Sequence, residues 1–201
     1  MQLKQLKRQM KKNIFTKQEA QLVAFGTAPN TLKLQLHQWV RSGELVSLKR
    51  GLYAFSDRDM SKTEIARALY SPCYISLEYT LNVYGLIPDV PFSMTLVTPK
   101  ATRIFDTPYG RFEYRKIKQE AFFGFDPETL IAEREKALLD YLYLNSKQLV
   151  PEPAYWRELR LDNLDDIDFG KAEHFAQRFG SKKLMKLLRG VKEYAGIDQA
   201  G

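Results

Sequence analysis

Seven side chains between residues 30 and 41 are of the types that recognise nucleic-acid bases. They combine amides, a hydroxyl, an imidazole, cations and one apolar group on one arc of an expected helix: Asn30, Thr31, Lys33, Leu34, His37, Gln38 and Arg41. Amides and cations bind base edges in the major groove, and an apolar side chain can contact the thymine methyl group. The segment therefore predicts a DNA-reading helix, in which Leu34 needs either such a contact or internal packing.

Two further cations follow this segment. Lys49 and Arg50 precede Gly51, between two β-rich runs at residues 44–48 and 52–55. A three-residue loop that ends in glycine is typical of a β-hairpin. Cations at the tip of such a hairpin can bind phosphates or enter the minor groove. We expect weaker contacts with the DNA backbone from Lys11, Lys12 and Lys17.

Catalytic chemistry has little support in the sequence. The two histidines, His37 and His174, have no recognisable nucleophile partner, so we expect both at the surface. The chain has neither a P-loop nor a GxGxxG motif, and its single cysteine, Cys73, excludes an internal disulfide and a cysteine-based zinc site. We therefore predict a protein that is not an enzyme and that carries no metal or cofactor.

Two acidic groups leave an alternative open. Residues 133–136 lack the acidic-x-lysine spacing of a metal-dependent nuclease, and Glu133 and Lys136 read as neighbours one helical turn apart. The second group consists of Asp165, Asp166 and Asp168. It could bind Mg²⁺, but Asp168 stands where a helix N-cap is expected. A metal-dependent nucleic-acid enzyme is the resulting alternative.

The first 58 residues provide the elements that would position the DNA-reading side chains. Apolar residues at helical spacing predict a first helix: Leu3, Leu6, Met10 and Ile14. The capping box from Thr16 to Glu19 predicts a second helix, which stops at Gly26. A third helix, capped by Thr27 or Asn30, would end near Ser42 and bury four residues: Leu32, Leu36, Trp39 and Val40. Helices followed by a hairpin predict a winged helix-turn-helix domain; the alternative is a helical domain with solvated or protein-docking faces.

The charge distribution favours the DNA-binding interpretation. Residues 1–60 hold eleven lysines and arginines against four acidic residues, whereas residues 61–201 hold twenty of each. The net charge of +7 therefore lies entirely in the first sixty residues. A basic module attached to a neutral body is typical of nucleic-acid-binding proteins.

Residues 59–201 are expected to form a mixed domain of helices around a small, mainly antiparallel sheet. Capping residues and apolar periodicity predict helices that begin at Ser61 and Ser76 and helices over 133–145, 152–161, 169–179 and 182–194. A strand over 94–98 and a hairpin over 102–118 are predicted between them. Without regular β–α alternation, the class is α+β.

The last helix carries a stripe of five cations: Lys182, Lys183, Lys186, Arg189 and Lys192. Four apolar residues lie opposite: Leu184, Leu187, Leu188 and Val191. The stripe is either a solvated helix face or a second contact for RNA, DNA or an acidic partner. No apolar run is long enough for a membrane span, and the first twelve residues lack the apolar region of a signal peptide, so we expect a cytoplasmic protein.

Several segments resemble the AbiEi family of antitoxins and transcriptional regulators. The similar strings lie at residues 74–88, 95–98, 105–114 and 131–140, and the resemblance covers roughly residues 10–145. It implies that the winged helix binds inverted repeats in a promoter and represses transcription, with residues 30–41 reading DNA and Lys49 and Arg50 forming the wing contact. It also implies a type IV toxin–antitoxin system of abortive phage infection. There, the C-terminal domain opposes an AbiEii-like nucleotidyltransferase toxin without a stable complex. A regulator without a toxin is the alternative.

Overall fold

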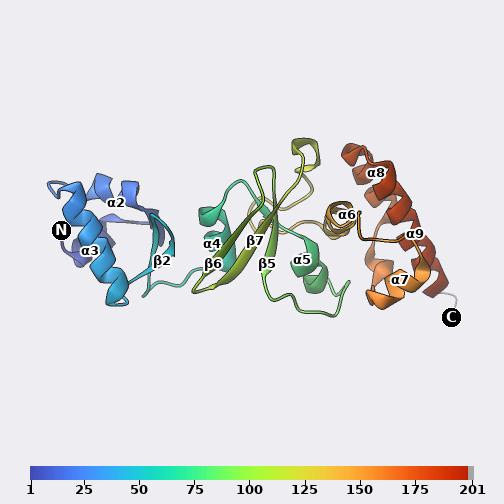
Figure 1. Ribbon diagram of the computed structural model, residues 1–201, viewed down its shortest axis with the longest axis horizontal. Coiled ribbons are helices and arrows are strands. Elements are labelled where there is room, and N and C mark those ends of the chain that lie inside the picture. Colours follow the sequence, from blue (N-terminus) through green and yellow to red (C-terminus); the bar gives the residue numbers. More distant parts are fainter. Residues whose placement is uncertain (199–201) are drawn as a thin grey trace. The chain divides into compact units, whose positions relative to one another are not determined.

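The computed structural model describes the backbone of residues 1–198 and the side chains of residues 1–196 (Figure 1). The chain is α+β, with helices and two small sheets. It divides into two compact units: residues 1–71 with 105–110, and residues 72–104 with the chain from 111 onward. The boundary that the sequence predicts at residue 58 therefore lies inside the first unit.

Residues 1–71 of the first unit form four helices and three strands, and residues 105–107 add the end of β6 (Arg103–Thr107), a strand whose beginning lies in the second unit. In order, the elements of residues 1–71 are α1 (Leu3–Gln9), β1 (Ile14–Thr16), α2 (Lys17–Val23), α3 (Pro29–Arg41), β2 (Leu45–Lys49), β3 (Leu52–Phe55) and α4 (Lys62–Leu69). The strands form an antiparallel sheet in the order β1-β3-β2. The prediction that Ile14 belongs to the first helix is wrong, because Ile14 pairs with Ala54 in this sheet. Ile14 and Thr16, both β-branched, favour a strand on either side of Phe15, whose ring is fully buried.

Local hydrogen bonds begin the helices as the sequence predicts. The Glu19 N–H donates to Thr16 Oγ1 at 3.1 Å, and the Thr16 N–H donates to the Glu19 carboxylate at 2.7 Å. Lys12 also donates to Glu19 at 2.9 Å, and together these bonds lower the pKa of Glu19. Ser61 and Glu64 form the same capping box at the start of α4. Both predicted capping boxes are thus confirmed, although α2 ends at Val23, three residues before Gly26.

The core of the first unit lies between the sheet and α1–α3. Leu6, Phe15, Leu32, Leu36 and Phe55 have no exposed surface, and the rings of Phe15 and Phe55 lie 4.9 Å apart. Trp39 and Val40 pack against this cluster while half-buried. The inner face predicted for α3 is therefore confirmed.

Arg58 fastens α1 to the rest of the first unit. Its guanidinium donates to the carbonyl oxygens of Lys7, Met10 and Lys12 at 2.8–3.3 Å and lies 4.4 Å from the centre of the Phe55 ring. Lys7 and Met10 are at the C-terminal end of α1, where carbonyl groups lack helical partners.

Arg58→Ala is expected to lower the free energy of unfolding by about 1–3 kcal/mol, because it leaves part-buried carbonyl groups without donors. Urea unfolding of the full chain would measure this, with Arg58→Lys as the matched variant that keeps the charge but loses the forked geometry. Equal stability of the alanine variant and the parent would show that Arg58 is not a structural clamp.

The second unit is built on a four-stranded sheet with helices around it. Its elements are β4 (Tyr74–Ile75), α5 (Leu77–Val83), β5 (Met94–Thr98), β6 (Arg103–Thr107), β7 (Gly110–Lys116), α6 (Arg134–Leu144), α7 (Pro153–Glu158), α8 (Phe169–Phe179) and α9 (Lys182–Asp198). Two short 3₁₀ helices, η1 (Gln119–Ala121) and η2 (Leu164–Asp166), complete it.

The sheet contains a parallel pairing, a detail that the prediction of a mainly antiparallel sheet did not specify. The strand order is β4-β5-β7-β6, with β4 antiparallel and β7 parallel to β5. The parallel pairing arises because the second strand of the β6–β7 hairpin, not the first, lies beside β5. Met94 is thereby opposite Phe112, and Thr98 is opposite Lys116.

The helices of the second unit pack around α6, which contacts α5, α8 and α9, and Figure 1 shows α8 beside α9. Leu138, Leu142, Trp156 and Leu188 belong to the buried core between them. The predicted ends of α8 are confirmed: Asp168 accepts from the Lys171 N–H at 2.9 Å, and Gly180 is left-handed. Among the helices described, none combines the length and apolarity needed to cross a membrane.

A buried ion pair occupies the centre of the second unit. Lys136 and Asp140 have no exposed side-chain surface, and Lys136 Nζ donates to Asp140 Oδ1. Asp140 Oδ2 accepts from Tyr74 Oη and Ser76 Oγ, each at 2.8 Å. Lys136 Nζ also donates to Tyr74 Oη at 2.6 Å.

This network corrects two sequence predictions. Ser76 occupies the N-cap position of α5, but its hydroxyl makes no capping bond because it donates to Asp140. Lys136, expected as the i,i+3 neighbour of Glu133, is buried and paired with Asp140 instead. Glu133 instead pairs with Lys171 at 2.6 Å, on the protein surface.

Candidate nucleic-acid interface

The seven side chains predicted to read DNA lie together on the outer face of α3. All seven are exposed, whereas Leu32 and Leu36 on the opposite face are fully buried. Leu34 lies at the centre of the exposed face, one turn from Asn30, His37 and Gln38. Its side chain is 65% exposed, so internal packing does not account for it.

The polar side chains at the start of α3 do not form capping hydrogen bonds with the helix. Ala28 is the N-cap and makes no side-chain bond, and Pro29 supplies the first helical residue. Neither Thr27 nor Asn30 caps the helix, contrary to both sequence alternatives. The exposed groups of Asn30 and Thr31 therefore make no capping bonds, and the 13-residue helix, about 20 Å long, has the dimensions of a major-groove reader.

The β2–β3 hairpin presents one cation at its tip rather than two. Lys49 is the last residue of β2 and pairs with Leu52, so the turn consists of Arg50 and Gly51. Gly51 has φ +79°, as predicted for a left-handed glycine. Lys49 is partly buried: its ammonium donates to the Leu69 carbonyl and lies 5.2 Å from the Phe105 ring centre. Arg50 is exposed.

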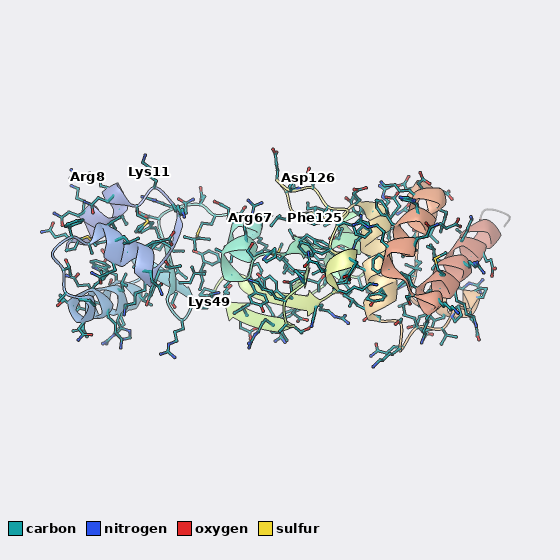
Figure 2. All side chains as sticks on the ribbon, turned by 90° about the horizontal axis from the view of Figure 1, so that it is seen from above. Arg8, Lys11, Lys49, Arg67, Phe125 and Asp126 are labelled. Carbon is teal, nitrogen blue, oxygen red and sulfur yellow. The ribbon has the colours of Figure 1, made fainter. Side chains whose placement is uncertain are left out.

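The other predicted backbone contacts differ in their surroundings. Lys11 is exposed, projects away from the ribbon in Figure 2, and makes no ion pair among the described residues. Lys12 is paired with Glu19, and Lys17 is half-buried. On α3, Lys33 and Arg41 are exposed and likewise make no ion pair within the described chain. The unpaired cations thus include Lys11 and the two on α3.

The cationic stripe of α9 is exposed as predicted. Lys182, Lys183, Lys186, Arg189 and Lys192 all face solvent, and the four apolar residues opposite them are buried. Lys192 forms an ion pair with Glu173 at 2.8 Å. The other four members make no ion pair in the described part of the chain.

The acidic groups mainly have structural partners. Asp168 caps α8, and Asp166 pairs with Arg134 at 3.1 Å. Glu135, like Glu133, pairs with Lys171. No group of three or more potential metal ligands converges among the described residues, and both His37 and His174 are exposed.

No family model matches the chain, and no curated protein matches it significantly.

Proposed function

We propose that the chain is a sequence-specific repressor that binds duplex DNA through a winged helix-turn-helix and also acts as an antitoxin of the AbiEi kind. The observation that carries the DNA-binding part is the exposed face of α3, whose hydrogen-bonding side chains are not needed by the fold. The order of helices, hairpin and three-stranded sheet in the first unit is consistent with this domain type.

In the proposed complex, α3 lies in the major groove. Asn30, Gln38 and Arg41 would bind base edges, and Leu34 would contact a thymine methyl group. Arg50 at the hairpin tip and Lys11 would bind phosphates, which sets the position of α3 without reading sequence. Two copies on an inverted repeat would occupy half-sites about one helical turn apart, and their presence on a promoter would exclude transcription.

The salt dependence of binding tests this proposal. Fluorescence anisotropy with the DNA upstream of the gene should give a logarithmic slope of about −0.9 per phosphate neutralised, against a weaker affinity for scrambled duplex. Binding that does not change with salt would contradict the electrostatic part. Equal affinity for both duplexes would contradict sequence-specific reading.

The antitoxin part of the proposal is supported by the resemblance and by the cationic stripe of α9. We propose an AbiEii-like nucleotidyltransferase toxin, encoded beside this gene, that the chain opposes in the cytoplasm without a stable complex. Co-expression with that toxin should restore growth. Alanine replacement of Lys182, Lys183, Lys186 and Arg189 should impair rescue while leaving promoter binding intact. Full rescue by that variant would exclude a role of the stripe in opposing the toxin. The absence of a toxin gene would favour a regulator that acts alone.

A further inference from the structure

A second cationic site lies in the second unit, away from α9's stripe in sequence. It is a pocket of about 430 Å³ formed where β7 ends and where the chain leaves α6. Lys116, Lys118 and Lys147 line it together with Ile117, Tyr143 and Leu144. No carboxylate is among the lining residues. Three lysines therefore line this pocket without a carboxylate beside them in its lining.

The three lysines of this pocket have no anionic partner in the part of the chain that the structure describes. None of them forms an ion pair with the described residues, although ion pairs occupy Lys12, Lys171 and Lys192 elsewhere. Lys118 Nζ lies 3.7 Å from the position that a Cβ of Gly180 would occupy, which places this ammonium beside the end of α8. An anion in a pocket lined by three cations would be attracted to each of them.

A further donor lies next to the pocket. Asn145, between two lining residues, accepts from Arg115 Nη1 at 3.0 Å, and its own amide nitrogen is buried without a hydrogen-bond partner. Arg115 also donates to the Leu144 carbonyl at 3.2 Å, which fixes this part of the chain and adds a fourth positive charge nearby. A buried donor without a partner is uncommon in proteins.

We propose that this pocket binds the polyphosphate group of a nucleotide, with the half-buried Leu144 and Tyr143 side chains against its planar base. Lysines bind phosphate as point charges, and bases stack on aromatic rings. The pocket volume is within the range of small-ligand sites. The same chemistry would recognise a free nucleoside triphosphate or the triphosphorylated 5′ end of an RNA. This function is separate from the proposed duplex binding by α3.

Isothermal titration calorimetry of the full chain tests the proposal. Nucleoside triphosphates should bind, and the matching nucleosides should bind at least about tenfold more weakly, because hydrogen bonds to charged groups contribute roughly that much. The variant K116Q/K118Q/K147Q should lose at least about tenfold in affinity. The variant K186Q/R189Q/K192Q removes the same charge from α9 and should bind as the parent does. If a 5′-triphosphorylated RNA binds more tightly than a nucleoside triphosphate, the ligand is an RNA end. If the two bind equally, the ligand is a free nucleotide.

Three results would overturn the proposal. These are no binding of any triphosphate at low salt, an equal loss in the α9 control, and unchanged affinity in the pocket variant. Ligand protection of Lys116, Lys118 and Lys147 from acetylation, measured by mass spectrometry on the parent protein, provides an answer even where the variant does not fold. Promoter binding by the same pocket variant should be unchanged. A failure of the nucleotide-binding proposal is therefore distinguishable from a failure of the proposed DNA-binding function.

Discussion

Replacing Asp140 by alanine is expected to lower the free energy of unfolding by about 3–5 kcal/mol. The variant leaves the Lys136 ammonium buried without its carboxylate, between the rings of Tyr74, Phe123 and Phe179 at 4.9–5.2 Å from their centres. Those rings attract a cation but do not replace an anion. Burial lowers the pKa of Lys136 and raises the pKa of Asp140, so the interior opposes the charged form of each residue.

Thermal and urea unfolding would measure this loss, which corresponds to a fall in Tm of roughly 10 °C for a chain of this size. The double variant K136M/D140L should recover most of the stability, because it removes both charges and keeps apolar volume. Glu173→Ala, which breaks the exposed pair with Lys192, should cost less than about 1 kcal/mol. A similarly small loss of stability for Asp140→Ala would show that the buried Lys136–Asp140 pair is not needed to stabilise this core.

The double variant R41A/R50A is expected to weaken promoter binding by about 2–4 kcal/mol, or roughly 30- to 1000-fold. One cation lies on the outer face of α3 and the other at the hairpin tip, and both are exposed. Their loss removes one proposed base contact and one proposed phosphate contact. The salt slope should therefore also become shallower, by about 0.9 for the phosphate contact.

The matched control is K186A/R189A, which removes two exposed cations from α9 and should leave promoter binding unchanged. An equal loss in that control would mean that net charge, rather than the α3 face and the hairpin, determines affinity. Lys49→Ala is informative beside these variants. Because Lys49 donates to the Leu69 carbonyl, we expect Lys49→Ala to change the free energy of unfolding, and to change DNA affinity only through the hairpin that Lys49 helps to position.

The sequence predicted best those features that are made by residues close together in the chain. The capping boxes at Thr16 and Ser61 and the cap at Asp168 each join residues three apart, so their pattern is visible in a linear reading. The exposed face of α3 followed from helical periodicity for the same reason. These features depend little on tertiary contacts.

Features that depend on distant partners were missed. The four-residue spacing of Lys136 and Asp140 is apparent in the sequence, but their burial depends on Tyr74 and Ser76, more than sixty residues away. The position of Lys49 likewise depends on Leu69 and Phe105. Local pattern alone cannot distinguish a paired lysine in the interior from a solvated one on a helix face.

The clamp formed by Arg58 holds α1 through main-chain oxygens, which every amino acid carries. The position of α1 is therefore insensitive to the identity of its outward side chains, apart from Lys7, which pairs with Asp57. The exposed residues Lys4 and Arg8 of α1 can change without altering how the helix is anchored. The charge on the outer surface of α1 is thus decoupled from the anchoring of the helix: substitutions that change the first leave the second constant.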